Sequence, residues 1–256
     1  MGKSPHRRPC RGCEAGHGLG FEPAVAFQPI LDMDRGGAVM AYEALVRGPD
    51  GQEAGWVLDQ VPPGRLYALD SACRIAAVEE AVRLGLAATG AKLSVNVLPS
   101  AILDPATCMR TTLAAAERTG FPTGQLLFEL SEQEKVADPR HLQRVIAGLR
   151  SMGFTVAIDD FGAGNAGLSL LADLTVDMVK LDMHLVRHCD ADRRRRVILE
   201  SITVACRALG IAVVAEGVET GAEYRTLRGI GIGLVQGFLF ARPGFRHLPQ
   251  AVLPEG

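Results

Sequence analysis

The chain has 256 residues, 48% of them apolar, which exceeds most small modules and suffices for one domain with a sizeable core. Its formal net charge of −2 excludes a broad basic field that would bind nucleic acid non-specifically, so no DNA partner is expected. No run approaches the roughly 20 apolar residues of a membrane span, so no membrane insertion is expected either.

Residues 1–20 are basic and rich in glycine, and we expect them to form a flexible tail before a single domain over residues 21–256. The tail lacks the apolar segment of a secretory signal, and most of the six cysteines stand alone, as is usual for reduced thiols. A cytoplasmic location is therefore predicted. Cys10 and Cys13 could supply half of a zinc site, but no second cysteine pair follows at suitable spacing, so a disordered tail is preferred.

Short apolar runs alternate with longer amphipathic stretches from residue 24 onward. Eight runs have the length and the branched or aromatic residues typical of strands that are covered on both faces. The expected strands are 24–30, 39–46, 92–97, 126–130, 155–160, 177–182, 213–218 and 234–239. The expected helices are 66–86, 99–119, 139–152, 193–209 and 220–231.

Strands that alternate with helices predict an α/β fold, and eight strands make a closed (β/α)8 TIM-like barrel the preferred architecture. The chain length is close to the roughly 250 residues typical of such a barrel. Only the short segment 31–38 joins the first two strands, and we expect it to form a hairpin. The barrel should therefore be irregular at its first strand.

Nearly every expected strand carries a polar residue at or near its C-terminal end. These residues are Glu43, Asn96, Glu129, Asp159, Asp160, Lys180, Glu216 and Gln236. The C-terminal strand ends of a barrel meet at one mouth, so residues distant in sequence become neighbours there. Burying one carboxylate costs several kcal/mol unless it is paired or bound to a metal, so packing alone does not explain four or five of them.

The chemistry of this set is specific, because its donors are oxygen atoms with no histidine or cysteine among them. Such ligands favour Mg²⁺, Mn²⁺ or Ca²⁺ over zinc or copper. The adjacent Asp159 and Asp160 can direct carboxylates to two ions, the usual arrangement for attack of water on a phosphodiester. Lys180 could donate to the phosphate oxygens or orient the nucleophile. Helix caps and a barrel salt bridge would explain one acid, but not the whole set.

Seven short motifs follow one another along the chain in a characteristic order. They are YEALVRG (42–48), SVNV (94–97), FELSE (128–132), DDFGAG (159–164), VKLD (179–182), AEGVET (215–220) and VQGFLFARP (235–243). In this order they resemble the EAL-domain family, and the form AYEALVRGPDG is similar to EAL domains attached to BLUF blue-light sensors. The resemblance implies a (β/α)8 barrel with an antiparallel first strand, and cleavage of cyclic di-GMP to linear pGpG with Mg²⁺ or Mn²⁺.

The resemblance also implies a role for each matching position. The implied metal ligands are Glu43, Asn96, Glu129 and Asp159 for the first ion and Asp160 for the second. The implied catalytic residues are Lys180, which would contact the attacking water, Glu216 and Glu43. The residues implied along the substrate are Gln28, Leu45, Arg47 and Gln236. The residues implied to support the loop after Asp160 and the metal cluster are Glu132, Asp182 and Glu219.

The sequence departs from the family in the loop after Asp160. The common form is DDFGTGYSSL, whereas residues 159–170 read DDFGAGNAGLSL. In the family this loop couples metal binding to a dimer interface, so the loss of hydroxyls and of an aromatic ring should loosen or rewire it. A homodimer is expected, and a separate regulatory protein could control the domain. The alternatives are a catalytically weak receptor for cyclic di-GMP or a protein-interaction module, and a different metallohydrolase on the same barrel.

Other features have simpler interpretations than a functional site. The arginines of 193–196 follow acidic residues and are expected on a solvated or interface face. His184 and His188 are expected on the surface. Trp56 is interpreted as a core or packing residue, although its segment could border the guanine pocket. The cysteines expected to be small core residues are Cys73, Cys108 and Cys206.

Overall fold

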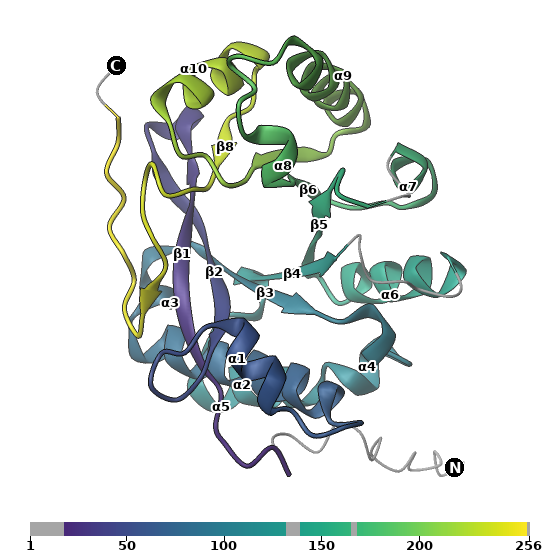
Figure 1. The fold of residues 1–256 in the computed structure, drawn as a ribbon. Helices are drawn as coiled ribbons and strands as arrows, with labels where there is room; N and C mark the ends of the chain where they lie inside the picture. The colour runs from purple at the N-terminus through teal and green to yellow at the C-terminus, as the bar shows by residue number, and fades with distance from the viewer. Residues whose placement is uncertain (1–17, 132–138, 165–167, 255–256) are drawn as a thin grey trace.

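The computed structural model describes residues 18–131, 139–164 and 168–254, and Figure 1 traces them as one ring of strands with helices outside it. The strands are β1 Ala24–Asp32, β2 Ala38–Arg47, β3 Lys92–Val97, β4 Leu126–Ser131, β5 Thr155–Phe161, β6 Met178–Leu181, β7 Ala212–Ala215, β8 Leu234–Val235 and β9 Gly244–Phe245. Each of the first eight lies within or across a run expected from the sequence. The short β9 was not expected.

The ring closes through β1. Strands β2 to β8 pair in sequence order and all in parallel, and β1 pairs with both β8 and β2 in the antiparallel sense. The prediction of a (β/α)8 TIM-like barrel with an antiparallel first strand is therefore confirmed. The reversal is made by the expected hairpin, where Gly36 and Gly37 have φ of 69° and 82°, a backbone conformation that residues with a Cβ rarely adopt.

The helices are α1 Ala54–Gln60, α2 Leu66–Arg83, α3 Leu86–Thr89, α4 Pro105–Cys108, α5 Arg110–Thr119, α6 Pro139–Ser151, α7 Leu168–Asp173, α8 Met183–Val186, α9 Arg193–Leu209 and α10 Gly221–Ile230. The described residues also form the 3-10 turns η1 Met33–Arg35, η2 Pro99–Ala101 and η3 Thr123–Gln125. The single helix expected over 99–119 was wrong: it is divided into η2, α4 and α5, because Pro99 and Pro105 lack an N–H and each begins a new element.

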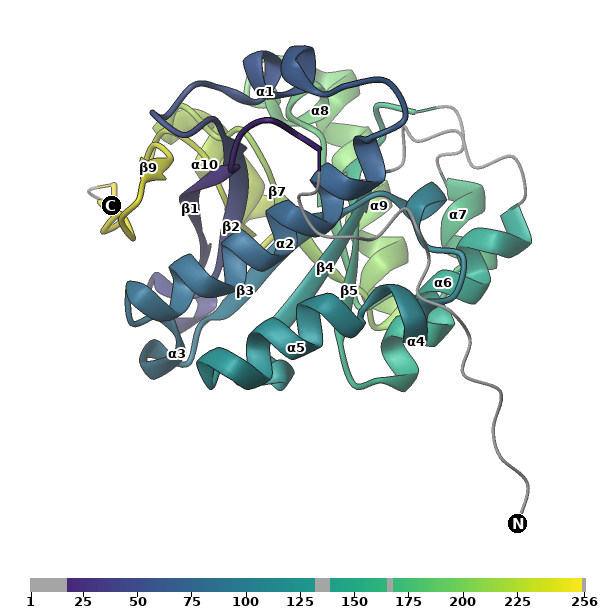
Figure 2. The ribbon, with the colours of Figure 1, turned by 90° about the horizontal axis from the view of Figure 1, so that it is seen from below.

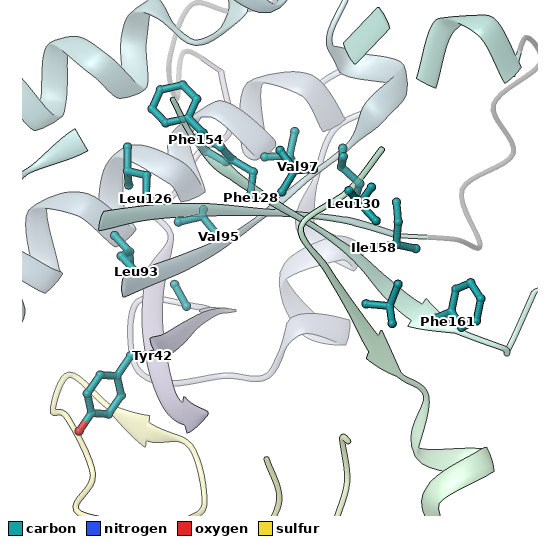
Figure 3. Packing of buried hydrophobic residues seen from close by; sticks show 14 of the residues in the cluster. Tyr42, Leu93, Val95, Val97, Leu126, Phe128, Leu130, Phe154, Ile158 and Phe161 are labelled. Carbon is teal, nitrogen blue, oxygen red and sulfur yellow. The ribbon is translucent and has the colours of Figure 1, made fainter. Parts of the chain in front are cut away.

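Two groups of apolar side chains lie in and around the barrel, and a third, smaller group surrounds Leu19. The larger group lies between the barrel and its helices and includes Val95, Val97 and Phe128 (Figure 3). On this side α2 and α5 lie next to each other outside the strands (Figure 2). The second group fills the lower part of the barrel interior; we call it the lower layer, and it consists of Ile30, Ala41, Leu127, Ala157, Met178 and Val214.

Several expectations from the sequence concern the outside of the fold. Cys108 and Cys206 are buried as expected, while Cys73 is half-buried. Trp56 packs edge-on against Phe21 with ring centroids 6.0 Å apart, yet it is 39% exposed. His184 and His188 are both exposed, as expected. The arginines of 193–196 begin α9 after its capping residue.

The start of the described chain is attached to the barrel. Leu19 is buried and packs with Val57 and Leu69. Cys10 and Cys13, for which zinc binding was the less favoured interpretation, lie outside the described residues, and the division into a tail and a domain stays a prediction. Among the described helices, none has both the length and the hydropathy that a bilayer crossing requires.

Candidate active site

The polar residues at the strand ends gather at one mouth of the barrel. Alternate residues of a strand point to the same side, so the residue two positions beyond a lower-layer residue also faces the barrel interior. At these positions the side chains are polar. On β4, for example, Glu129 is the next inward-facing residue after Leu127, and on β6 Lys180 is the next after Met178. We call the polar set the upper layer; it consists of Glu43, Ser94, Asn96, Glu129, Asp159, Lys180 and Glu216.

Lys180 lies at the centre of the upper layer and is fully buried. Its Nζ lies 2.6 Å from a carboxylate oxygen of Glu216, 2.8 Å from Glu129, 3.0 Å from Asp159 and 3.1 Å from Glu43. An ammonium has three protons and cannot serve four carboxylates at once. Oδ1 of Asp159 accordingly has no hydrogen-bond partner, although Nζ is close.

Neighbouring side chains fix the two deepest carboxylates. Ser94 Oγ donates to Oε1 of Glu129 at 2.5 Å. Asn96 Nδ2 donates to Oε1 of Glu43 at 3.2 Å, and Gln236 Nε2 donates to its Oε2 at 2.8 Å. Sequence reasoning missed Ser94, although its place two residues before Asn96 puts both on the inward side of β3.

Asp159 and Asp160 are adjacent in β5, and regular strand geometry would point them to opposite faces. The register between β5 and β6 shifts between Ile158 and Phe161, and Asp160 has a φ of 55°. Such a bulge re-aims a side chain, and an aspartate tolerates this backbone region better than most residues. Both carboxylates consequently line the same cavity at the mouth.

The carboxylates form two groups that share one member. In the first group Glu43, Glu129 and Asp159 each place one oxygen within 4.8 Å of the others. In the second group Asp159, Asp160 and Glu216 do the same. If all five are ionised, they and the single ammonium leave four negative charges, the amount that two divalent cations neutralise. With oxygen donors only, these residues fit two hard cations such as Mg²⁺ or Mn²⁺.

The cavity at the mouth has a volume of about 280 Å³. Of the residues expected along the substrate, Gln28, Leu45 and Gln236 line it. Arg47 does not: its Nη1 donates to the carbonyl of Val46 at 2.8 Å, and its side chain lines a second cavity. This second cavity is mainly apolar, has a volume of about 320 Å³ and shares the lining residue Leu45 with the first.

Comparison with known proteins places the chain in a family. The family model described as "EAL domain" matches residues 21–243. The chain belongs to the EAL-domain family.

Relatives of this EAL domain include proteins with larger chains. The blue light- and temperature-regulated antirepressor BluF of Escherichia coli is 31% identical over 232 residues, which are 90% of this chain and 56% of BluF. The chain therefore spans little more than half of that protein. A blue-light-regulated relative agrees with the resemblance of AYEALVRGPDG to BLUF-linked domains. Relatives in Pseudomonas aeruginosa and Shewanella oneidensis are named cyclic di-GMP phosphodiesterases.

Solved structures of similar proteins contain cyclic di-GMP. A standalone versatile EAL protein from Vibrio cholerae O395, in its c-di-GMP-bound form, is 43% identical with a TM-score of 0.85; the match covers 91% of this chain and 96% of that one. BlrP1 of Klebsiella pneumoniae, in a complex with manganese and cyclic di-GMP, is 35% identical with a TM-score of 0.81 over 91% of this chain and 58% of that one. The BlrP1 structure thus contains a divalent ion together with cyclic di-GMP.

The electrostatics of the EAL domain follow from its crowded carboxylates. Burial raises the pKa of Glu129 well above its usual value, and the neighbouring Glu43 raises it further. Burial likewise raises the pKa of Glu216 to about 8 and that of Asp160 to about 6. Burial would lower the pKa of Lys180, but the carboxylates around it, Asp159 first, raise it well above the usual value. Lys180 is therefore charged at neutral pH.

Glu43 behaves differently from its neighbours. Burial would raise its pKa, but the ammonium of Lys180 and the hydrogen bonds from Gln236 and Asn96 together outweigh burial and lower it. Glu43 is therefore ionised in the metal-free site, while the pKa of about 8 for Glu216 favours its protonated form at neutral pH. The site thus holds a proton that a metal cation would displace.

The expected supporting residues are placed as follows. Asp182 is buried. Its Oδ1 accepts a hydrogen bond from the backbone N–H of His184 at 2.7 Å and lies 2.8 Å from Nδ1 of the same histidine. Glu219 forms an ion pair with Arg187. Sequence reasoning missed Arg187, which also lines the cavity at the mouth. Glu132 and residues 165–167 lie outside the described residues, so the expected bracing of the loop after Asp160 stays a prediction.

Proposed function

We propose that this EAL domain hydrolyses cyclic di-GMP to linear pGpG with two divalent ions, Mg²⁺ or Mn²⁺. The observation that carries the proposal is the pair of carboxylate groups that share Asp159 and surround Lys180. Two cation sites that share a carboxylate are the arrangement used for displacement at a phosphodiester. The cyclic di-GMP in the Vibrio cholerae and BlrP1 structures and the names of the phosphodiesterase relatives support the choice of substrate.

The two groups divide the proposed metal ligands. Glu43, Asn96, Glu129 and Asp159 would hold the first ion. Asp160 would hold the second, with Glu216 beside it. When bound, the ions lower the pKa of water and neutralise charge on the phosphate oxygens. Asn96 donates its Nδ2 to Glu43, and its carboxamide oxygen is the atom that would bind a cation.

The remaining polar residues orient the reactants. Lys180 keeps its proton because of the carboxylates around it, so it acts as a donor that orients the attacking water rather than as a base. Gln236 holds Glu43 and contacts Oε1 of Gln28 at 3.3 Å, which places both amides at the edge of the cluster. The water oxygen forms the new bond to phosphorus, the bond to the 3′ oxygen breaks, and that oxygen leaves with a proton.

The substrate would lie across the mouth on Gln28, Leu45 and Gln236. Leu45 borders both cavities, so it lies where an extended dinucleotide would pass from one to the other. Arg47 would have to leave the carbonyl of Val46 to meet a phosphate. Of the residues expected along the substrate, it is the one for which binding requires the largest change.

The domain is further proposed to form a homodimer and to act in the cytoplasm, where a separate regulatory protein could control it. Exposed apolar residues on α9 support a dimer: Val197 is 45% exposed and Val204 is 64% exposed, and their spacing of seven places them on one face. Free thiols at the described cysteines are compatible with a reducing compartment.

The second candidate function is a receptor that binds cyclic di-GMP without efficient hydrolysis. The departure of the loop after Asp160 from the family form supports it. Against it stands the retention of all the expected metal ligands at the mouth, since a receptor does not need two clustered groups of carboxylates.

The test is incubation of the purified chain with cyclic di-GMP and Mg²⁺, Mn²⁺ or EDTA, with pGpG followed by chromatography. Formation of pGpG with a metal and none with EDTA is expected. No product with either metal, together with micromolar binding of intact cyclic di-GMP, would overturn the hydrolase in favour of the receptor.

A further inference from the structure

Asn96 lies in the part of β3 that pairs with only one of its two neighbouring strands. The ladder between β2 and β3 ends at the pair Ala44–Val95. The ladder between β3 and β4 continues to Val97–Leu130. Asn96 and Val97 are therefore held by strand pairing on the β4 side alone, and Leu98 belongs to neither ladder.

A buried carboxylate on α2 supplies the missing support. The backbone N–H of Leu98, the first residue after β3, donates to Oδ1 of Asp70 at 3.0 Å. Asp70 is buried, and both it and the segment 96–98 line the second cavity, of about 320 Å³. Because a cavity lies against this segment, packing fixes it less firmly than a filled core would. The hydrogen bond from Leu98 thus has a larger share in fixing the backbone.

Asp70 is itself held in place by further polar contacts on the helices. Its other oxygen forms an ion pair with Arg74, a fully buried arginine one turn along α2. Nε of Arg74 donates to Oγ1 of Thr112 on α5 at 3.1 Å. Two helices and one strand end are thereby joined by one chain of polar contacts.

Burying these charged groups has a cost in folding free energy. Burial raises the pKa of Asp70 despite the attraction of Arg74, so the carboxylate loses more from its surroundings than the ion pair returns. A buried ion pair often contributes less to stability than apolar residues of the same size would. What it provides is a fixed geometry at the end of β3.

We propose that Asp70 is a positioning residue for Asn96: by fixing Leu98 it sets where the carboxamide stands in the metal cluster. The inference rests on the proposed function, in which Asn96 is a metal ligand. Two peptide units separate Leu98 from Asn96, and Val97 between them is packed in the core. A shift at Leu98 therefore moves Asn96 away from Glu43, whose Oε1 it contacts at 3.2 Å.

The experiment measures Mn²⁺ affinity of the full chain by isothermal titration calorimetry. Asp70→Ala is expected to weaken binding about tenfold, the lower end of the effect usual for residues that orient metal ligands. Asp70→Asn is expected to stay within about threefold of the original chain, because its Oδ1 still accepts from Leu98. Added to Asn96→Ala, Asp70→Ala should weaken binding no further, since its effect passes through Asn96.

Two variants separate positioning from general stability. Ser71→Ala removes a neighbouring contact between α2 and α5, the 3.1 Å hydrogen bond of Ser71 with Thr111, without touching β3. It should lower the melting temperature and leave Mn²⁺ affinity unchanged. Leu98→Pro removes the donor to Asp70 at a position whose φ of −81° suits proline, and it also replaces the partly buried leucine side chain. It should weaken Mn²⁺ binding as much as Asp70→Ala, including in the case that Asp70→Ala does not fold.

The outcomes distinguish this inference from the proposed function. If Asn96→Ala weakens Mn²⁺ binding but Leu98→Pro and a folded Asp70→Ala do not, the positioning role is wrong and the metal site stands. Additive losses in the double variant would also overturn it, because they would show an effect that does not pass through Asn96. If the original chain binds no Mn²⁺, the proposed function fails and this inference fails with it.

Discussion

The lower and upper layers of the barrel interior share strands β2, β4, β5, β6 and, with Glu216 just beyond its end, β7, yet they differ in what they need. The lower layer packs Leu127, Met178 and their neighbours without a polar partner. The upper layer, two residues further along, surrounds one ammonium with four carboxylates. A strand therefore passes from core to site within two residues, so the stability of the barrel and the chemistry of its mouth can be tested separately.

The largest expected effect comes from removing the single cation of the upper layer. Lys180→Met should lower kcat/KM for cyclic di-GMP by about 10³-fold or more, because the donor that orients the water is lost. Chromatography of pGpG measures it. Lys92→Met is the matched control, since Lys92 begins β3 at the end of the strand away from the mouth and donates to the carbonyl of Gly124. Equal activity of the two variants would refute the role of Lys180.

The lower layer should affect stability instead. Leu127→Ala removes a fully buried side chain and is expected to cost about 3 kcal/mol of unfolding free energy, because it leaves a cavity. Urea denaturation followed by circular dichroism measures this cost. Mn²⁺ affinity of the folded variant should be unchanged. A large loss of Mn²⁺ affinity would mean that the two layers are not separable.

The pH dependence sharpens the comparison, because only the upper layer titrates. The pKa of Glu216 is raised to about 8, so between its unfolded value and 8 the native metal-free state holds a proton that the unfolded state has released. Native stability without metal therefore falls as pH rises through this window. Because Mn²⁺ displaces that proton, its apparent affinity should rise about tenfold per pH unit from pH 6 to 8.

Isothermal titration at several pH values measures this slope. Proton release on Mn²⁺ binding can be read from the same titrations in buffers of different ionisation enthalpy. A pH-independent affinity would contradict the protonation of Glu216 in the metal-free site. Leu127→Ala offers a control, since a change in the lower layer should leave the slope as it is.

The smallest expected effect concerns Ser94, which donates to Glu129. Ser94→Ala removes one hydrogen bond to a buried carboxyl, for which a loss of about 1 to 2 kcal/mol in metal binding or stability is typical. Mn²⁺ affinity and melting temperature would be measured together. No change in either would show that Glu129 is held by Lys180 alone.

Most of the barrel was predictable from the sequence, because buried parallel strands give short apolar runs with polar residues at one end. From the sequence alone, that pattern predicts that Glu43, Glu129 and Lys180 lie at one mouth. The gathering of Asp159 and Asp160 was less accessible, since regular alternation would separate adjacent residues and only the bulge in β5 brings them together.

Contacts between distant elements were harder to foresee. Asp70 lies within an apolar helical pattern, and a polar residue on such a face was a signal that could have been read. Its acceptor role for Leu98 depends on how α2 crosses β3, which the sequence does not specify. Arg187 carried no signal of its own, because its partner Glu219 comes from a different loop.

The antiparallel β1 has a consequence for how the ring is joined. Strand β8 is bound by two residue pairs to β7 and by two to β1, which makes this the thinnest part of the barrel wall. The next residue, Gln236, reaches across it with its side chain to Gln28 on β1 and Glu43 on β2. The wall is thus completed by the same amide that orients the site. Any fluctuation that parts β8 from β1 also withdraws a hydrogen bond from Glu43.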